Sequence, residues 1–448
     1  RLRTVTGVQT CALPISLGAG VHASAAIGPP GAPGAPTVTA FDQAVELRWH
    51  APTSTGGLPI DSYRITWPQG NRTRTASGTA TTFRFPGLPN GEFASFTVAA
   101  HTTAGWGPAS PISSGVYPTR PNILLILTDD QRYDSLDQMP ITMAHGWRNF
   151  VNSYVPEPQC CPARASLLTG RLPSHTGVDT LERGNRLDDD ITIATMLKNV
   201  GYQTRFFGKY LNSYPFGRRP FNPPGWETFQ AFVGRYGYYD YTLAGGSKYL
   251  HFGSAETDYA TDKIGALAVD AAQAASPKRP IFMELAPISP HWPLEIAPRH
   301  VNACLDRTFP LPPNFNATDT RGEPAWLAAE APKSARSVTD AYRRTCAMLA
   351  SVDEMDDAVM RELARERRLA NTYVVFTSDN GYQFGEHRLT DKGDLYEESI
   401  RVPLIVRGPG VVSGTDERLT SNIDLAPTFA EWARATPPTG FFDGTSFA

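Results

Sequence analysis

The chain contains few cysteines and no long apolar run. Five cysteines occur in 448 residues, too few and too scattered for a disulfide framework, although Cys304 and Cys346 form a candidate bridge if the protein is exported. No apolar run is long enough to cross a membrane. The net charge of −3 provides no basic field for nucleic acid. We therefore expect a protein of two or three globular domains, with no membrane span and no nucleic-acid partner.

Residues 1–33 are interpreted as an artefact followed by a Pro/Gly linker. RLRTVTGVQTCALPIS, at 1–16, lacks the charged and apolar regions of a signal peptide and resembles a translated sequencing adapter. We exclude this segment, with Cys11, from fold reasoning. The run GPPGAPGAP that follows is typical of a stiff, extended linker.

Short alternating runs follow the linker and indicate a small antiparallel β-sandwich. The runs are AVELRWH, DSYRITW, TTFRFPGL and ASFTVAA, separated by turn-forming clusters. Residues 34–118 resemble a fibronectin type III module, although Ala94 stands where that family usually has a tyrosine. The matching positions are Trp49, GGLPIDSYRI with Tyr63, Leu88, Phe96, Val98 and TTAGWGPAS. We interpret the module as a spacer, since no aromatic cluster favours a carbohydrate-binding role.

CCPARASLLTG, at 160–170, has the pattern of a short helix that begins with two cysteines. Pro162 suits a first helical turn, and Gly170 stands where helices commonly end. The N–H groups and dipole at the helix start are expected to favour an anion and to lower the pKa of a thiol. Arg164, one turn on, is expected to return its guanidinium toward Cys160. Taken singly, these residues would be a buried cysteine and a surface arginine.

Two apolar runs lead into acidic and amide side chains. ILLIL is followed by Asp129 and Asp130, and VVF is followed by Asp379 and Asn380. Such runs are typical of strands buried on both faces of a parallel sheet, and ligands bind at the carboxyl ends of these strands. If the strands are adjacent, Ca²⁺ or Mg²⁺ would offset the repulsion between the carboxylates. Either pair alone is as easily explained by a turn or a helix cap.

Three further side chains that carry or can carry positive charge follow strand-like segments. Lys209 ends YQTRFFGK, His291 lies between two prolines after RPIFMELAP, and Lys392 precedes a helical segment. Alone, each would be a surface lysine or a satisfied histidine, and their positions after apolar runs make them candidates for the same pocket. His175 and His387 are expected to be structural or to lie at the rim.

The segment CCPARASLLTG matches the sulfatase signature C-x-P-x-R-x-x-x-x-T-G. NILLILTDDQ, GYQTRFFGKY, APISPHWP, TSDNGYQFGEH and RVPLIVRGPG follow in the order seen in that family. Residues 121–448 therefore resemble the sulfatases of the alkaline phosphatase superfamily. CCPAR, FFGKYLN and TSDNGY resemble the N-acetylglucosamine-6-sulfatase-like branch most closely. The resemblance implies an α/β fold with a mixed, mostly parallel sheet sandwiched by helices.

The resemblance also implies a mechanism. A separate maturation enzyme would oxidise Cys160 to formylglycine, whose hydrate supplies one hydroxyl to attack sulfur and a second to expel sulfate. Cys161 would only pack. The implied metal ligands, usually for Ca²⁺, are Asp129, Asp130, Asp379 and Asn380. Arg164 would orient the diol. The residues that would hold the sulfate or assist the leaving group are Lys209, His291 and Lys392.

Three positions depart from the family pattern. Leu211 replaces a histidine found in many sulfatases, so the assignment of a general acid depends more on His291 and Lys392. Ala163 replaces the usual serine or cysteine of the signature, which the maturation motif tolerates. The sequence ends at DGTSFA, where relatives continue into a small C-terminal subdomain, so we expect the catalytic domain to be truncated.

The leading functional hypothesis is a sulfuric ester hydrolase acting on a sulfated sugar or another alcohol sulfate. One alternative is a phosphonate or phosphate ester hydrolase of the same superfamily, because such enzymes share the metal site. The other is a non-catalytic carbohydrate-binding protein. Because a sandwich precedes a hydrolase whose substrates are commonly extracellular, we expect a secreted, periplasmic or extracellular protein.

Overall fold

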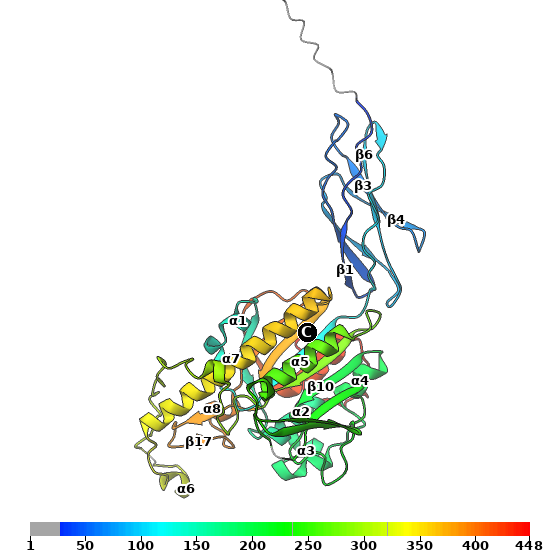
Figure 1. Ribbon diagram of the computed structural model, residues 1–448. Coiled ribbons are helices and arrows are strands. Elements are labelled where there is room, and N and C mark those ends of the chain that lie inside the picture. The colour runs from blue at the N-terminus through cyan, green and yellow to red at the C-terminus, as the bar shows by residue number, and fades with distance from the viewer. Residues whose placement is uncertain (1–26, 235, 320) are drawn as a thin grey trace, which may run out of the picture. The chain divides into compact units, whose positions relative to one another are not determined.

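The computed structural model describes residues 27–234, 236–319 and 321–448. They form an N-terminal β part and a C-terminal α/β part (Figure 1). The interpretation of residues 1–16 as an artefact, together with Cys11, lies outside the described residues. Within those residues, no helix combines the length and hydropathy needed to cross a membrane.

The N-terminal part contains a three-stranded and a four-stranded sheet. The first is formed by β1 (Thr37–Phe41), β2 (Ala44–Arg48) and β5 (Thr82–Pro86), and the second by β3 (Ser62–Trp67), β4 (Arg72–Ser77), β6 (Thr97–Thr102) and β7 (Gly105–Trp106). In β3 the apolar side chains of Tyr63, Ile65 and Trp67 are buried, as the alternation predicts. The four runs singled out from sequence correspond to β2, β3, β5 and β6, whereas β1, β4 and β7 were not predicted.

A ten-stranded mixed sheet forms the centre of the C-terminal part, which confirms the predicted fold class. The strand order is β13-β12-β11-β10-β14-β8-β15-β18-β9-β19, and the five strands from β11 to β15 run parallel. The strands are β8 (Asn122–Thr128), β9 (Arg148–Tyr154), β10 (Gln203–Gly208), β11 (Thr228–Phe232), β12 (Tyr241–Gly245), β13 (Lys248–Phe252), β14 (Ile281–Ala286), β15 (Thr372–Ser378), β18 (Leu404–Arg407) and β19 (Gly414–Ser421). A separate ribbon pairs β16 (Gln383–Phe384) with β17 (Thr390–Asp391).

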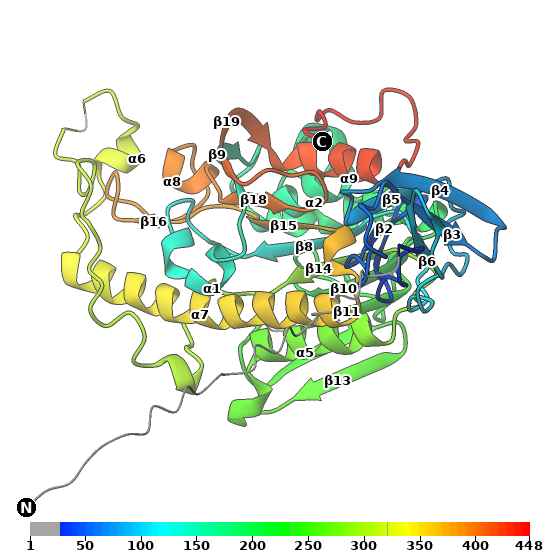
Figure 2. The ribbon, with the colours of Figure 1, turned by 90° about the horizontal axis from the view of Figure 1, so that it is seen from above.

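Helices cover both faces of this sheet (Figure 2). They are α1 (Pro140–Met143), α2 (Cys160–Thr169), α3 (Pro173–Thr176), α4 (Ile193–Asn199), α5 (Ala260–Gln273), α6 (Ala325–Ala328), α7 (Ala335–Arg365), α8 (Glu397–Ile400) and α9 (Leu425–Trp432). Side chains of β8 alternate between two apolar cores. Ile123, Leu125 and Leu127 pack with α2, α4 and α9, while Leu124 and Ile126 pack with α5 and α7. This burial on both faces explains the unbroken apolar run.

A disulfide joins Cys304, in the long segment after β14, to Cys346 of α7. It is the bridge that the cysteine count left as a candidate. The bridged segment also contacts the β16–β17 region, because Phe315 forms a β-bridge with Glu386. The disulfide therefore connects α7 to a segment that lies beside β16 and β17.

Glu284 is a buried carboxyl in the middle of β14. Strand alternation places it on the face that Phe282 and Ala286 share with the α2 core. Its Oε2 atom has no hydrogen-bond partner among the described residues. Burial raises the pKa of this carboxyl to about 8, although Arg164 lowers it in part. The folded protein therefore holds Glu284 protonated at neutral pH.

We expect Glu284→Gln to stabilise the fold increasingly as the pH rises. Between the ordinary pKa of 4.5 and about 8, the unfolded carboxyl is ionised and the folded one is protonated, so the free energy of unfolding falls with rising pH. Glutamine removes this loss of roughly 1 kcal/mol per pH unit. Urea unfolding between about pH 5 and 8 measures the difference. The exposed Glu431→Gln serves as a control, and a pH-independent difference for Glu284→Gln would contradict the prediction.

Candidate active site

Helix α2 begins at Cys160 and ends at Thr169, as the sequence predicted. Gly170 follows in the left-handed conformation with φ 67° and donates its N–H to Ser166, which closes the last turn. All ten residues of α2 are buried. Cys160 is therefore a buried residue at the N-terminal end of α2.

The strands β8 and β15 are adjacent and parallel, with Thr128 opposite Ser378. Asp129 and Asp379 are therefore the first residues beyond the same edge of the sheet. Asp130, which follows, has a left-handed backbone with φ 65°, and its N–H donates to Asp379 Oδ1 at 3.3 Å. This arrangement brings the predicted carboxylates together, as the strand-end rule requires.

The environment of Cys160 corrects one expectation about its thiol. The thiol donates to Asp129 Oδ1 at 3.5 Å, and Lys392 Nζ lies 2.8 Å from Sγ. Burial, followed by the charge of Asp129, raises the pKa of Cys160 to about 12. The predicted lowering at a helix N-terminus is therefore wrong, because desolvation and a neighbouring carboxylate outweigh the helix dipole and the nearby lysines.

Arg164 and Lys209 are buried beside the carboxylates. Arg164 donates to Asp379 Oδ2 at 2.8 Å and to the Lys209 carbonyl at 2.6 Å, and its Nη2 lies 3.5 Å from Asp129. Its hydrogen bonds thus go to Asp379 and the Lys209 backbone, whereas the sequence predicted that the guanidinium would turn toward Cys160. Lys209 Nζ forms an ion pair with Asp129. Burial would raise the pKa of Asp129, but Lys209, His291 and Arg164 hold it below its usual range.

Lys392 and His291 complete the cluster from two loops. Lys392 Nζ forms an ion pair with Asp130 and lies 3.8 Å from Asp129. His291 Nε2 lies 3.7 Å from Asp130 Oδ2, and the His291 Nδ1 contacts the Trp292 carbonyl. The structure therefore brings together all nine residues that the sequence singled out as catalytic or metal-binding.

These residues fit a hard divalent cation. Potential ligand atoms of Asp129, Asp130, Cys160 and His291 lie within 4.8 Å of one another. Asn380 donates its Nδ2 hydrogen to Asp130 at 2.7 Å, while its buried Oδ1 has no hydrogen-bond partner among the described residues. An unpaired amide oxygen beside carboxylates is the donor type that Ca²⁺ and Mg²⁺ prefer.

Residues outside the predicted set also border the cluster. The Tyr236 ring lies 5.6 Å from Lys209 Nζ, and the run of aromatic residues GRYGYYDY was its only signal in the sequence. Leu211 is fully buried in the α2 core, so the position is filled by an apolar side chain. His175 hydrogen-bonds Asp443, and His387 stacks on Tyr396. Within the part of the chain that the structure describes, neither histidine contacts Cys160 or the carboxylates of the cluster, in keeping with their predicted structural or rim role.

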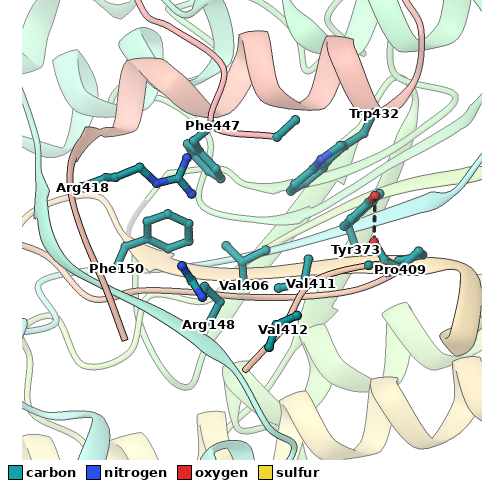
Figure 3. A pocket seen from close by; sticks show the side chains of 12 residues that line it. Arg148, Phe150, Tyr373, Val406, Pro409, Val411, Val412, Arg418, Trp432 and Phe447 are labelled. Carbon is teal, nitrogen blue, oxygen red and sulfur yellow. Dashed lines mark hydrogen bonds between the residues drawn. The ribbon is translucent and has the colours of Figure 1, made fainter. Parts of the chain in front are cut away.

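A cavity of about 350 Å³ lies elsewhere in the C-terminal part (Figure 3). Trp432 stacks on Tyr373 at 3.9 Å, and Phe150 and Phe447 line the cavity with them. Tyr373 lies at the start of β15, whereas Asp379 follows its end. The cavity is therefore at the opposite ends of the parallel strands from the cluster and is not the candidate active site.

The fold and the cluster define a class: an α/β protein with a candidate metal site and a buried cysteine at the carboxyl ends of central parallel strands. The family model described as Sulfatase matches residues 121–435, and a model described as Fibronectin type III domain matches residues 31–116. The chain belongs to the sulfatase family. Membership implies a metal ion and a formylglycine derived from cysteine.

The chain is similar to several known proteins. N-acetylglucosamine-6-sulfatase of Capra hircus is 35% identical over 73% of this chain and 63% of its own length. An extracellular sulfatase SULF-1 homolog of Drosophila melanogaster is 32% identical over 75% of this chain and 31% of its own length. The chain thus spans less than two thirds of these relatives. A solved structure of a protein in complex with its substrate D-glucosamine-2-N,6-O-disulfate has a TM-score of 0.62 and 24% identity, covering 73% of this chain and 79% of that one.

Proposed function

We propose that the C-terminal part hydrolyses sulfuric esters. The observation that carries the proposal is the convergence of Cys160 with three carboxylates and the side chains of Arg164, Lys209 and Lys392 in a member of the sulfatase family. Formylglycine at Cys160 would supply a hydroxyl nucleophile. The metal would supply positive charge to the ester oxygens. We assign Asp129, Asp130, Asp379 and Asn380 as its ligands and Ca²⁺ as the ion, because Ca²⁺ accepts irregular sets of oxygen ligands.

The residues around Cys160 have distinct proposed roles. Arg164, held by Asp379, orients the nucleophile, and its charge favours an anionic ester. Lys209 is fixed by Asp129 at the inner side of the cluster and binds a sulfate oxygen. Lys392 lies beside Cys160 Sγ, and His291 lies beside Asp130 on a more exposed loop. These two are placed to bind the sulfate or to give a proton to the leaving alcohol.

We propose a sulfated sugar, with a 6-sulfated glucosamine as the first choice, as the substrate. The similarity to N-acetylglucosamine-6-sulfatase supports this choice. We further propose that residues 34–118 form a spacer module and residues 121–448 the catalytic domain. The disulfide between Cys304 and Cys346 and the similarity to an extracellular sulfatase favour an exported protein that a formylglycine-generating enzyme matures.

Rates on nitrophenyl sulfate and on a nitrophenyl phosphate diester test the reaction class. We expect faster turnover of the sulfate, with inorganic sulfate released in equal amount to nitrophenol. Faster turnover of the phosphate diester would instead establish the phosphonate or phosphate ester hydrolase. Activity that survives loss of Cys160 would count against both enzymes.

We expect His291→Ala to impair sugar sulfates more than nitrophenyl sulfate. A sugar alcohol is a poor leaving group that needs a proton, whereas nitrophenolate leaves without one, so the loss of kcat should reach about 10²-fold or more only with the sugar. His175→Ala is the matched control, because His175 pairs with Asp443 away from the carboxylates. Equal losses of kcat on the two substrates would show that His291 is not the proton donor, and Lys392 would then be the remaining candidate.

A further inference from the structure

Two parts of the site lie in loops beyond regular strands. Asp130 is the second residue after β8, and Lys392 directly follows the short strand β17. Positive φ values occur at Asp130 (65°) and at three residues just before Lys392: His387 (51°), Arg388 (64°) and Asp391 (90°). Such conformations persist in non-glycine residues only where the surrounding contacts impose them. Something must therefore hold these two loops in place.

Arg132 links the loop of Asp130 to the segment after Asn380. Its side chain is only 6% exposed. The guanidinium donates to both carboxylate oxygens of Asp134 at 2.9 Å, and its Nη1 donates to the Tyr382 carbonyl and to Glu386 Oε1, also at 2.9 Å. Aromatic rings lie beside it, with Phe309 at 5.5 Å and Phe384 at 5.6 Å from the guanidinium carbon. These contacts leave Arg132 little freedom to move.

Glu386 extends the link toward Lys392. The carboxylate is fully buried, with Oε1 bound to Arg132 and Oε2 accepting the Phe384 N–H. Glu386 also directly precedes His387 and Arg388, the first residues with positive φ, and its backbone forms a bridge with Phe315. The ion pair thus connects a residue two positions after Asp130 with one six positions before Lys392.

We propose that the Arg132–Glu386 ion pair is a positioning device that holds the Lys392 ammonium against Asp130 and Cys160. Both partners are buried. Loss of the Arg132 charge would leave Glu386 uncompensated, whereas loss of the Glu386 charge would leave Arg132 paired with Asp134 alone and no longer tied to the loop that contains Lys392. Among the contacts of the described residues, neither side chain touches Cys160, so the pair acts through Lys392 and Asp130. Its effect on turnover depends on the proposed function, whereas its effect on metal binding at Asp130 does not.

A double-mutant cycle between Glu386→Gln and Lys392→Met tests the link to Lys392. Glu386→Gln alone is expected to lower kcat on nitrophenyl sulfate about 10- to 100-fold, the usual cost of losing a residue that orients a ligand. With Ca²⁺ held at saturation, so that weaker metal binding at Asp130 does not limit the rate, Glu386→Gln should cost less than about twofold in the Lys392→Met background, because the lysine that Glu386 positions is gone. Losses that multiply in the double variant would overturn the proposal.

A second measurement does not require turnover. The melting temperature of the whole protein is followed as Ca²⁺ is added to the wild type, Glu386→Gln and Arg132→Lys, because an ion bound to the native state raises it. Both variants should need at least about tenfold more Ca²⁺ for the same rise. Arg132→Lys keeps the buried charge and replaces Glu386→Gln if that variant does not fold.

Asp416→Asn is the control for general loss of stability. Asp416 is a buried carboxylate that pairs with Arg148 and Arg418, and Arg148 lies at the start of β9, away from the cluster. The Asp416→Asn variant should keep the wild-type kcat and the wild-type rise in melting temperature with Ca²⁺. Equal Ca²⁺ responses in wild type and Glu386→Gln would overturn the proposal, even if the protein hydrolyses no sulfate ester. If Ca²⁺ raises the melting temperature of the wild type but the protein does not hydrolyse nitrophenyl sulfate, the proposed function is contradicted and the proposal about the Arg132–Glu386 pair is not.

Discussion

Cys160→Ala is expected to lower the rate of nitrophenyl sulfate hydrolysis by on the order of 10⁴-fold or more. The substitution removes the sulfur from which a formylglycine would be made. It leaves the carboxylates, Arg164 and Lys209 in place. Because these residues bind the ester without attacking it, the KM should change far less than kcat. Steady-state rates over a range of ester concentrations measure both constants.

The adjacent cysteine provides a matched control. Cys161 is also buried in α2, but it packs in the apolar core and forms no contact with the carboxylates among the described residues. Cys161→Ala should therefore retain most of the activity. Mass spectrometry of the peptide that contains Cys160 should show the mass of an aldehyde in the wild type. Equal losses in the two variants, or an unmodified thiol in fully active protein, would contradict the assignment.

Removal of divalent metal is the second large effect that we expect. The ion would contribute several kcal/mol of stabilisation to the charge that develops on the ester oxygens, so a chelator should lower kcat by on the order of 10³-fold. Without the ion, the carboxylates of Asp129, Asp130 and Asp379 would face the positive charges of Arg164, Lys209 and Lys392, with His291 beside Asp130. Activity measured after dialysis and after return of Ca²⁺ or Mg²⁺ tests this.

Asp130→Asn should prevent the recovery. The variant keeps the size of the side chain but loses the charge that the cation needs. Asp416→Asn, in which the carboxylate pairs with arginines far from the cluster, should recover as the wild type does. If chelated protein keeps its full rate, the oxygen ligands do not hold a catalytic ion. Better recovery with Mg²⁺ than with Ca²⁺ would correct only the identity of the metal.

The elements that carry the site could be predicted because their signals are local. Pro162 and Gly170 mark the two ends of α2, and the apolar residues of β8 alternate between two buried faces. Because ligands bind at the carboxyl ends of parallel strands, the sequence also predicted that Asp129 and Asp379 lie close together. Their separation of 250 positions in the sequence did not matter, because β8 and β15 are neighbours in the sheet.

The remaining features depend on contacts that no local pattern encodes. The pKa of the Cys160 thiol follows from burial and from Asp129, both set by tertiary packing. Arg132 and Glu386 are separated by 254 positions, and each resembles an ordinary surface charge in the sequence. Only the folded loops show that the two are buried together. The strands β4 and β7 were missed because their sequences carry little pattern: no residue of β4 is buried, and β7 has two residues.

The complete enclosure of α2 constrains when Cys160 can be altered. Its side chain is 2% exposed in the folded protein, and the whole helix is covered. If a second protein oxidises this sulfur, as we propose, we expect it to act before the domain has folded. Protein made in a cell without such a partner would remain a thiol form that later mixing with the oxidising protein could not rescue. The fraction of active molecules in a preparation would then depend on whether oxidation of Cys160 precedes folding, and not on the folded structure that they share.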